Sequence, residues 1–380
     1  MNKRFLAVLF SIVLILSVTV AVILTAKGYR PNFDDKTMDI TGILVATSDP
    51  DGASVYLNNK LTTATNTTLN LKPGSYDVKI SKDGYYDWQK KIEIKKEEVF
   101  KTNAFLFPRA SDLRPITLNG VTNPTLSPDE SRVAFTVASA SATATGIYTL
   151  SMSGIPVINN VNIRQIFRDN GLALSKVEGL IWSADDTQLI ASQSGKYYML
   201  DTDKMTVSPT IISNTQLEVL KTGWQQETDL KAKSQLSKLQ ISLPIKNFKF
   251  SPDETKILYT ASSSATLPAP IINLPGSNPT PEVRSLISGS TYVYDLKEDR
   301  NYLINAQQVQ WFVTSRHLVI NEGKQISIME YDGTNKAVVY AGPFVDNYVF
   351  VWPNWAKIII LTNLNTSSTV GENLYTINLR

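Results

Sequence analysis

A short phrase of sequence recurs five times between residues 120 and 360, and it constrains the fold more than any other feature of the chain. Each copy has an apolar residue, a tight polar turn and then a run of β-branched or aromatic residues. The copies lie at residues 126–133, 182–189, 250–257, 312–318 and 351–358. Self-similarity with a period of roughly 40 to 70 residues is typical of radial or stacked repeats.

The residues around each turn extend the repeat to four strands. Third strands are predicted at residues 147–152, 197–202, 291–296, 326–331 and 374–379, and fourth strands at 156–158, 209–212, 301–304 and 336–340. Four antiparallel strands per copy make a propeller blade. The fifth copy ends at Arg380 without a fourth strand, and residues 113–120 have the matching pattern, so we expect them to close the ring. The prediction is an all-β propeller of five blades over residues 108–380, with a sixth blade possible only within 211–243.

The turn between the first two strands of each copy has a mechanical explanation. Proline presets φ for a type I turn, and Ser or Asp side chains bond back to the backbone, so Asp129, Asp185 and Asp253 are expected to form turns and not a catalytic set. The pattern resembles the TolB-type (WD40-like) propellers, whose blades carry Trp-Ser-Pro-Asp-Gly. Here Glu130, Asp186 and Glu254 replace the glycine. The resemblance implies protein interaction at the cell envelope and no catalytic residues.

The N-terminus carries a long uncharged stretch. Twenty-two residues, from Phe5 to Ala26, follow Lys3 and Arg4 without a charge, which is long enough to cross a bilayer as a helix. A cleaved signal peptide has a shorter apolar region and small residues before the cut. Here a cut after Ala26 would have the large residue Leu24 as the third residue before it. Residues 1–27 are therefore predicted to be an uncleaved anchor rather than a cleaved signal. The positive-inside bias places the N-terminus in the cytoplasm and the rest of the chain outside.

After a polar spacer, residues 28–41, a small β domain is predicted at residues 42–107. Four segments alternate apolar and polar residues as half-buried strands do, at 43–47, 54–57, 75–80 and 89–94, which predicts an antiparallel sandwich. Three turn elements follow in order, Pro50-Asp51-Gly52-Ala53, Pro73-Gly74-Ser75-Tyr76 and Gly84-Tyr85.

Together these turns resemble the PEGA domain, which is named for a Pro-Glu-Gly-Ala turn. The resemblance implies a surface or spacer module of an envelope protein rather than an enzyme. Gly52, Gly74 and Gly84 are predicted to take unusual φ values. The neighbouring Tyr85, Tyr86 and Trp88 could stack on a sugar, but we expect them to pack on the sheet.

Composition removes several kinds of chemistry. The chain has no cysteine, which excludes thiol catalysis, disulfides and thiolate metal sites. Its one histidine, His317, falls in a repeat column that is polar in every copy (Arg132, Gln188, Lys256 and Lys357), so we expect a solvated residue and not a catalytic or ligand histidine. Trp182 shares its column with Leu126, Phe250, Phe312 and Val351 and is expected in the core. The formal charge of +3 comes mostly from the N-terminus, so no nucleic-acid surface is expected, nor any cofactor or metal.

The long connections are expected on one face of the propeller. Connections between the second and third strands of a blade leave from the same face as connections between successive blades. The long connections of both kinds are residues 138–146, 159–179, 213–244, 261–290 and 363–373. We call it the loop-rich face, and we expect it to point away from the membrane because the linker enters the propeller opposite it, at Leu113. Residues 267–281 hold five prolines and are predicted to be an extended, exposed loop. Residues 215–239 have helical spacing of Leu217, Leu220 and Trp224, which favours a lid on the propeller over a partner-binding helix.

Two functional classes remain. The first is a single-pass, membrane-anchored extracytoplasmic binding or scaffold protein of the cell envelope. It would be non-enzymatic and hold a protein, peptide or glycan on the loop-rich face, through residues that the sequence does not identify. The second is an envelope carbohydrate-active enzyme with carboxylates in a central cleft, for which Asp169, Glu178, Glu227 and Asp229 are the candidates. It requires two carboxylates about 5 to 10 Å apart.

Overall fold

The computed structural model describes residues 3–26, 29–32, 37–139, 141, 143–153, 162–237, 239, 243–271, 274–345, 347–364 and 371–380. The chain divides into two compact units. Unit 1 holds residues 1–109 together with residues 269–282 and 296–300. Unit 2 holds residues 110–268, 283–295 and 301–380.

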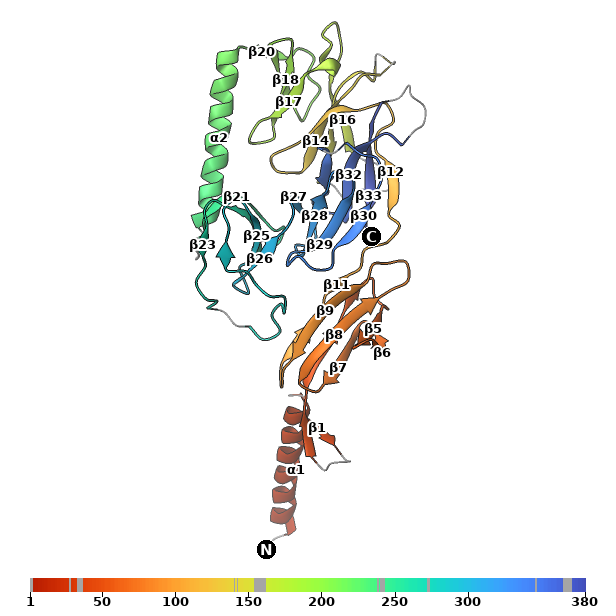
Figure 1. Ribbon diagram of the computed structural model, residues 1–380, viewed down its shortest axis with the longest axis vertical. Helices are drawn as coiled ribbons and strands as arrows, with labels where there is room; N and C mark the ends of the chain where they lie inside the picture. Colours follow the sequence, from red (N-terminus) through yellow and green to blue (C-terminus); the bar gives the residue numbers. More distant parts are fainter. Residues whose placement is uncertain are drawn as a thin grey trace. The chain divides into compact units, whose positions relative to one another are not determined.

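Unit 1 begins with helix α1, Lys3–Ala26 (Figure 1). Its segment Phe5–Thr25 has a mean hydropathy of 3.0 and is long and apolar enough to cross a membrane. The hydroxyls of Ser11 and Ser17 donate to the carbonyl oxygens of the residues four positions earlier, at 2.9 and 2.8 Å, so these polar groups are satisfied within the helix. In the predicted spacer, β1, Tyr29–Asn32, pairs antiparallel with β2, Thr37–Ile40.

The small domain of unit 1 is a two-layered β structure. One sheet has the order β6-β5-β8-β9, formed by β5 (Ser54–Leu57), β6 (Lys60–Ala64), β8 (Gly74–Ser81) and β9 (Trp88–Ile94). The other has the order β10-β3-β7, formed by β3 (Gly42–Ala46), β7 (Thr67–Leu71) and β10 (Val99–Lys101). Two pairings are parallel, β3 with β10 and β4 (Ser48–Asp49) with β11 (Ala104–Phe105), so the sandwich is mixed and not wholly antiparallel.

The core of this domain follows from strand alternation. Leu44, Val55, Ile80 and Ile92 are fully buried between the layers. Trp88 lies in the same core, as predicted. Tyr85 packs against it, and Tyr86 is covered by the Arg109 guanidinium, 4.9 Å from the ring centre. Gly52 and Gly84 take φ values of 66° and 79°, which confirms the left-handed turns expected at these two positions.

The described residues of unit 2 form five four-stranded sheets, which we number as blades 1 to 5. Blade 1 is β13 (Thr122–Leu126), β14 (Arg132–Val137), β15 (Gly146–Ser151) and β16 (Asn162–Arg168). Blade 2 is β17 (Gly179–Trp182), β18 (Gln188–Gln193), β19 (Lys196–Asp201) and β20 (Thr210–Ile212). Blade 3 is β21 (Ile245–Phe250), β22 (Lys256–Ala261), β25 (Thr291–Asp295) and β26 (Arg300–Ile304).

Blade 4 is β27 (Gln308–Trp311), β28 (His317–Asn321), β29 (Ile326–Glu330) and β30 (Ala337–Tyr340). Blade 5 is β31 (Val349–Val351), β32 (Lys357–Thr362), β33 (Asn373–Asn378) and β12 (Asp112–Pro115). The fourth strand of blade 5 therefore comes from the start of unit 2, and β12 pairs antiparallel with β33 from Asp112↔Asn378 to Pro115↔Tyr375. The propeller class that the repeat predicted is confirmed by this strand order.

The fourth strand of blade 1 differs from its prediction. It is β16, Asn162–Arg168, and not the apolar run 156–158, which lies outside the described residues. The connection from blade 1 to blade 2 is correspondingly shorter than expected. It contains a 3-10 turn, η1, at Leu174–Lys176.

Blades pack face to face through shared apolar cores. Blade 1 packs on blade 5 through a cluster that includes Phe135 and Ile359, and on blade 2 through a cluster that includes Ile147 and Trp182. Blades 3 and 4 share a third cluster, around Tyr302. The clusters take alternate residues of each strand, as expected for sheets covered on both faces.

On blade 2, a helix covers the face that is turned away from blade 1. The helix is α2, Asn214–Ser237, which runs beside blade 2 and leads to blade 3 (Figure 1). Its Leu217, Leu220 and Trp224 pack against Ile190 and Ile212 of blade 2, which confirms the predicted lid. Ile190 has the same position in its blade as Ala134 has in blade 1. Ala134 packs against the next blade, whereas Ile190 packs against α2. No sixth blade occupies the described part of residues 211–243, where β20 ends and α2 lies.

Candidate functional site

The repeated turns have the same hydrogen bonds in blades 1, 2 and 3. The Ser127 hydroxyl donates to Asp129 Oδ1 at 2.6 Å and accepts from the Arg132 N–H at 3.0 Å. Matching pairs occur at Ser183 with Asp185 and at Ser251 with Asp253, at 2.6 and 2.7 Å. These hydrogen bonds lower the pKa of Asp185. The three aspartates are thus turn formers, as predicted.

The residue after each of these aspartates has left-handed backbone geometry. Glu130, Asp186 and Glu254 have φ values of 61°, 61° and 57°, and Ser315 in blade 4 has 58°. This conformation disfavours most side chains and suits glycine. It explains physically why the propellers that the turns resemble carry glycine here.

The structure corrects the alignment of the fourth copy by one residue. Trp311 pairs with Leu318 just as Trp182 pairs with Leu189, so Trp311, and not Phe312, shares the column of Trp182. Both tryptophans are buried. Each donates its indole N–H to a carbonyl of the preceding blade, Trp182 to Thr125 O at 3.2 Å and Trp311 to Lys249 O at 3.0 Å. Trp182 is a core residue, as expected.

The expectation of a solvated residue was wrong for His317, and the other members of its column range from buried (Lys256) to half-buried (Arg132, Gln188 and Lys357). His317 is only 2% exposed, and its Nδ1 lies 2.7 Å from the Thr314 hydroxyl. Lys256, also buried, has its Nζ 3.5 Å from Asp295 and 4.7 Å from the centre of the Tyr331 ring. The column stands where one blade meets the next, so its polar groups find partners across the blades.

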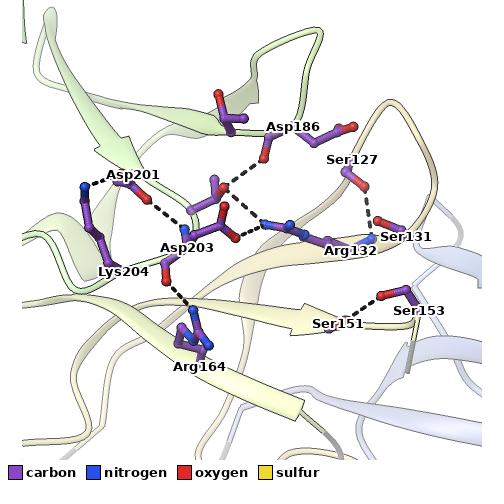
Figure 2. A network of polar contacts seen from close by, with 12 residues as sticks. Ser127, Ser131, Arg132, Ser151, Ser153, Arg164, Asp186, Asp201, Asp203 and Lys204 are labelled. Carbon is purple, nitrogen blue, oxygen red and sulfur yellow. Dashed lines mark hydrogen bonds and ion pairs between the residues drawn. The ribbon is translucent and has the colours of Figure 1, made fainter. Parts of the chain in front are cut away.

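At the contact of blades 1 and 2 this column opens into a cavity of about 700 Å³. Arg132 and Arg164 meet at Asp203 beside it, and Ser151 and Ser153 lie on the neighbouring strand (Figure 2). The cavity is lined by Arg132, Thr149, Ser151, Ser153, Ile163, Arg164, Gln165, Thr202, Asp203 and Met205. It lies at the end of the blades that carries the turns between first and second strands, which we call the short-turn face.

Strand register places Arg132, Thr149, Ser151 and Arg164, which line the cavity, on one face of the blade 1 sheet. Arg132 lies opposite Ser151, and Thr149 lies opposite Arg164. Directly opposed residues of antiparallel strands share a face. Further along the same face Ile147 is buried against blade 2, so the face changes from apolar to cationic toward the short-turn face.

Asp203 of blade 2 holds both arginines. The Nη1 of Arg132 donates to Asp203 Oδ1 at 2.8 Å and to the Thr202 hydroxyl at 3.2 Å. The Nη1 of Arg164 donates to the main-chain oxygen of Asp203. The N–H of Asp203 donates in turn to Asp201 Oδ1 at 2.8 Å, which lowers the pKa of Asp201. Figure 2 shows these contacts as one connected network.

Asp186 borders this network through its backbone and has an unusual carboxyl group. Its carbonyl accepts the Thr202 hydroxyl at 2.8 Å. Burial, together with the nearby Asp129 carboxylate, raises the pKa of Asp186 to about 6. Its Oδ1 is buried without a hydrogen-bond partner among the residues that the structure describes. The charged form of Asp186 is therefore costly to the folded state.

The four carboxylates proposed for the enzyme alternative have local partners. Asp169 accepts from Ser175 N and Oγ at 3.1 and 2.6 Å, beside η1. Glu178 accepts from Ser194 N at 3.0 Å. On α2, Glu227 forms an ion pair with Lys231 at 3.0 Å, and Asp229 accepts from Gln225 at 2.9 Å. Each contact holds a turn, loop or helix of this chain in place.

The loop-rich face carries a second cavity, of about 520 Å³, in blade 3. Its lining includes Gly289–Thr291 and residues 303–307, at the ends of strands. These residues offer backbone groups and small polar side chains. The predicted exposed loop at 267–281 is only partly exposed. Ile271 is 90% exposed, but Leu267 and Asn278 are buried. Within unit 1, Asn278 Oδ1 accepts from Lys90 Nζ at 3.3 Å.

The repeat does not reveal the arginine cavity. Its column predicts a solvated Arg132, and its fourth-strand pattern falls at 156–158 and not on β16, which carries Arg164. The cavity also depends on Thr202, a small residue of blade 2 that contacts Arg132 of blade 1. A contact between two blades cannot be seen in a single copy of the repeat.

Taken together, the strand order defines a β-propeller protein with a small β domain and an apolar N-terminal helix. The small domain is a PEGA domain: the model of that family matches residues 41–109, which confirms the resemblance drawn from its turns. No curated protein sequence matches the chain.

Several solved structures are similar to the chain. They include a putative TolB from Agrobacterium tumefaciens, with 13% identity, a TM-score of 0.22 and coverage of 67% of this chain and 78% of that one. TolB from Acinetobacter baumannii has 12% identity, a TM-score of 0.22 and coverage of 80% and 59%. The β-propeller domain of the Trilobed protease from Pyrococcus furiosus has 11% identity, a TM-score of 0.20 and coverage of 89% and 95%. Similarity at this level concerns the fold alone.

Proposed function

We propose that the chain is a non-enzymatic, membrane-anchored binding or scaffold protein of the cell envelope, with everything after α1 outside the membrane. The observation that carries the proposal is the presence in one chain of a bilayer-length apolar helix, a PEGA domain and a five-bladed propeller. Lys3 and Arg4, on the N-terminal side of the helix, favour this orientation. A propeller offers rigid strand ends on which loops of variable length present binding groups.

The binding surface in this proposal is the loop-rich face, and the partner is a protein, peptide or glycan. Two observations support it. The insertion containing α2 and the cavity of about 520 Å³ both belong to connections that leave from this face. The cavity is lined by backbone and small polar groups, such as Ser290 and Asn305, which suit hydrogen bonding to a peptide or a sugar.

Site-specific photocrosslinking in cells tests the proposal. A photoreactive residue is placed at the exposed Ser288 or Gln307 on the loop-rich face, and at the exposed Glu254 on the short-turn face of blade 3 as a matched control, away from the arginine cavity of blades 1 and 2. We expect crosslinked products at Ser288 and Gln307 and none at Glu254. Products at Glu254 alone would contradict the choice of face, and the lack of products at all three positions would contradict the binding function.

A further inference from the structure

The arginine cavity lies on the short-turn face and is not used by the function proposed above. We infer that it is a second binding site, which takes the carboxylate end of a peptide chain. The inference stands independently of the proposed function, because it rests on the contact between blades 1 and 2 alone.

The first step concerns hydrogen-bond donors. A guanidinium group has five N–H donors on three nitrogens. Within the described part of the chain, Arg132 and Arg164 are both held through Nη1. The Nε and Nη2 groups of two side chains that line one cavity remain for a ligand. Planar guanidinium groups match carboxylate oxygens in a bidentate geometry, which makes them suitable for binding a chain terminus.

The second step concerns charge. The lining contains two arginines and one aspartate, Asp203, so its formal charge is +1. One carboxylate brings this to neutrality. A phosphate group carries about two negative charges at pH 7 and would lie beside the Asp203 carboxylate with too little compensation. The side chain of Asp203 is 61% exposed, so it orients the arginines without sealing the cavity.

The third step concerns the rest of the ligand. The hydroxyl groups of Thr149, Ser151 and Ser153 can pair with peptide N–H and C=O groups. Met205 adds apolar surface for a side chain. A volume of about 700 Å³ falls within the range of pockets that enclose small ligands.

The fourth step is a comparison within the molecule. Gln188 pairs with Asp201 in blade 2, and His317 pairs with Glu330 in blade 4, so the next residues, Thr202 and Tyr331, correspond. At the contact of blades 3 and 4, the Tyr331 ring packs under Lys256, which stands in the column of Arg132. Thr202 leaves this space open between blades 1 and 2. The cavity is thus the consequence of a small residue where the sister contact has an aromatic one.

This comparison supplies a variant that blocks the site while keeping a side chain that the fold already accommodates. Thr202→Tyr places in blade 2 the residue that blade 4 has at the same position. Arg164→Gln removes one guanidinium. Arg168→Gln is the matched control, because Arg168 is an exposed arginine near the other end of β16 and does not line the cavity.

The experiment uses the full chain in lipid nanodiscs and ligand-observed NMR titration. The probes are a mixture of N-acetylated tripeptides with free C-termini, the same mixture as C-terminal amides, and inorganic phosphate. We expect the free acids to bind and the amides to bind at least about tenfold more weakly. Thr202→Tyr and Arg164→Gln should weaken binding of the acids about tenfold or more, with Arg168→Gln within about twofold of the wild type.

Circular dichroism and thermal unfolding of each variant establish that it is folded. Three results would overturn the inference: no binding by any acid in the mixture, equal binding of acids and amides, or binding of phosphate in place of the acids. Unchanged binding in a folded Thr202→Tyr protein would place the peptide elsewhere and would overturn it as well.

Discussion

At the scale of single residues, Asp186 makes a prediction about stability and pH. Its pKa is about 6 in the folded chain against an ordinary value of 3.8. The folded state therefore binds this proton more tightly, so the free energy of unfolding falls as pH rises through this interval and stays lower above it. Asp186→Asn removes the charge and keeps a residue type that tolerates left-handed backbone. We expect the variant to be more stable by about 1 kcal/mol at pH 7.5, with the gain lost at pH 4.

Thermal unfolding at the two pH values measures this difference. Asp185→Asn, one residue earlier, is the control of opposite sign. Hydrogen bonds lower the pKa of Asp185, so its charged form stabilises the fold and its loss should destabilise the chain at pH 7.5. A gain at pH 4 equal to that at pH 7.5 would show that the Asp186 charge is not the cause.

The repeat predicts the role of a residue well when all the contacts of that residue lie within one copy. The Ser and Asp side chains of each turn bond to neighbours within five residues, so Asp129 could be assigned from sequence. His317 could not, because its burial depends on how successive blades pack together. The arginine cavity has the same origin: Thr202 matters only in relation to Arg132, 70 residues away in sequence.

At the scale of elements, α2 is held by a few apolar contacts and should detach when one is removed. Leu217 is 2% exposed and packs on Ile190 and Ile212. Leu217→Ala should destabilise the packing of α2 by about 2 to 4 kcal/mol, because it leaves a cavity at a buried contact. Hydrogen exchange should show reduced protection of the α2 amides, with blade 4 unchanged.

The matched control is Val219→Ala, two residues on and 67% exposed, which should leave exchange as in the wild type. Equal protection of α2 in both variants would contradict the role given to Leu217.

The helix itself was predictable from its 3.6-residue spacing. β16 was not, because the pairing of β15 and β16 contains a register shift between Ile147 and Tyr148, which breaks the alternation along the strand.

At the scale of the whole molecule, the proposed orientation can be tested directly because the chain has no cysteine. A single introduced cysteine then reports its own side of the membrane. In intact cells, a membrane-impermeant maleimide should label Thr187→Cys and should label Asn2→Cys only after permeabilisation. The reverse pattern would contradict the orientation inferred from Lys3 and Arg4.

The strand β12 gives the propeller a mechanical property. It follows directly on the chain that leads from the anchor helix, and its pairing with β33 is also the seam that closes blade 5. Tension applied through the N-terminal segment is therefore carried along the chain past Ser111, whose hydroxyl donates to Val339 O of blade 4 at 2.9 Å, into the four residue pairs of this seam. Under load, the strand that joins the propeller to the anchor is also the strand that completes blade 5.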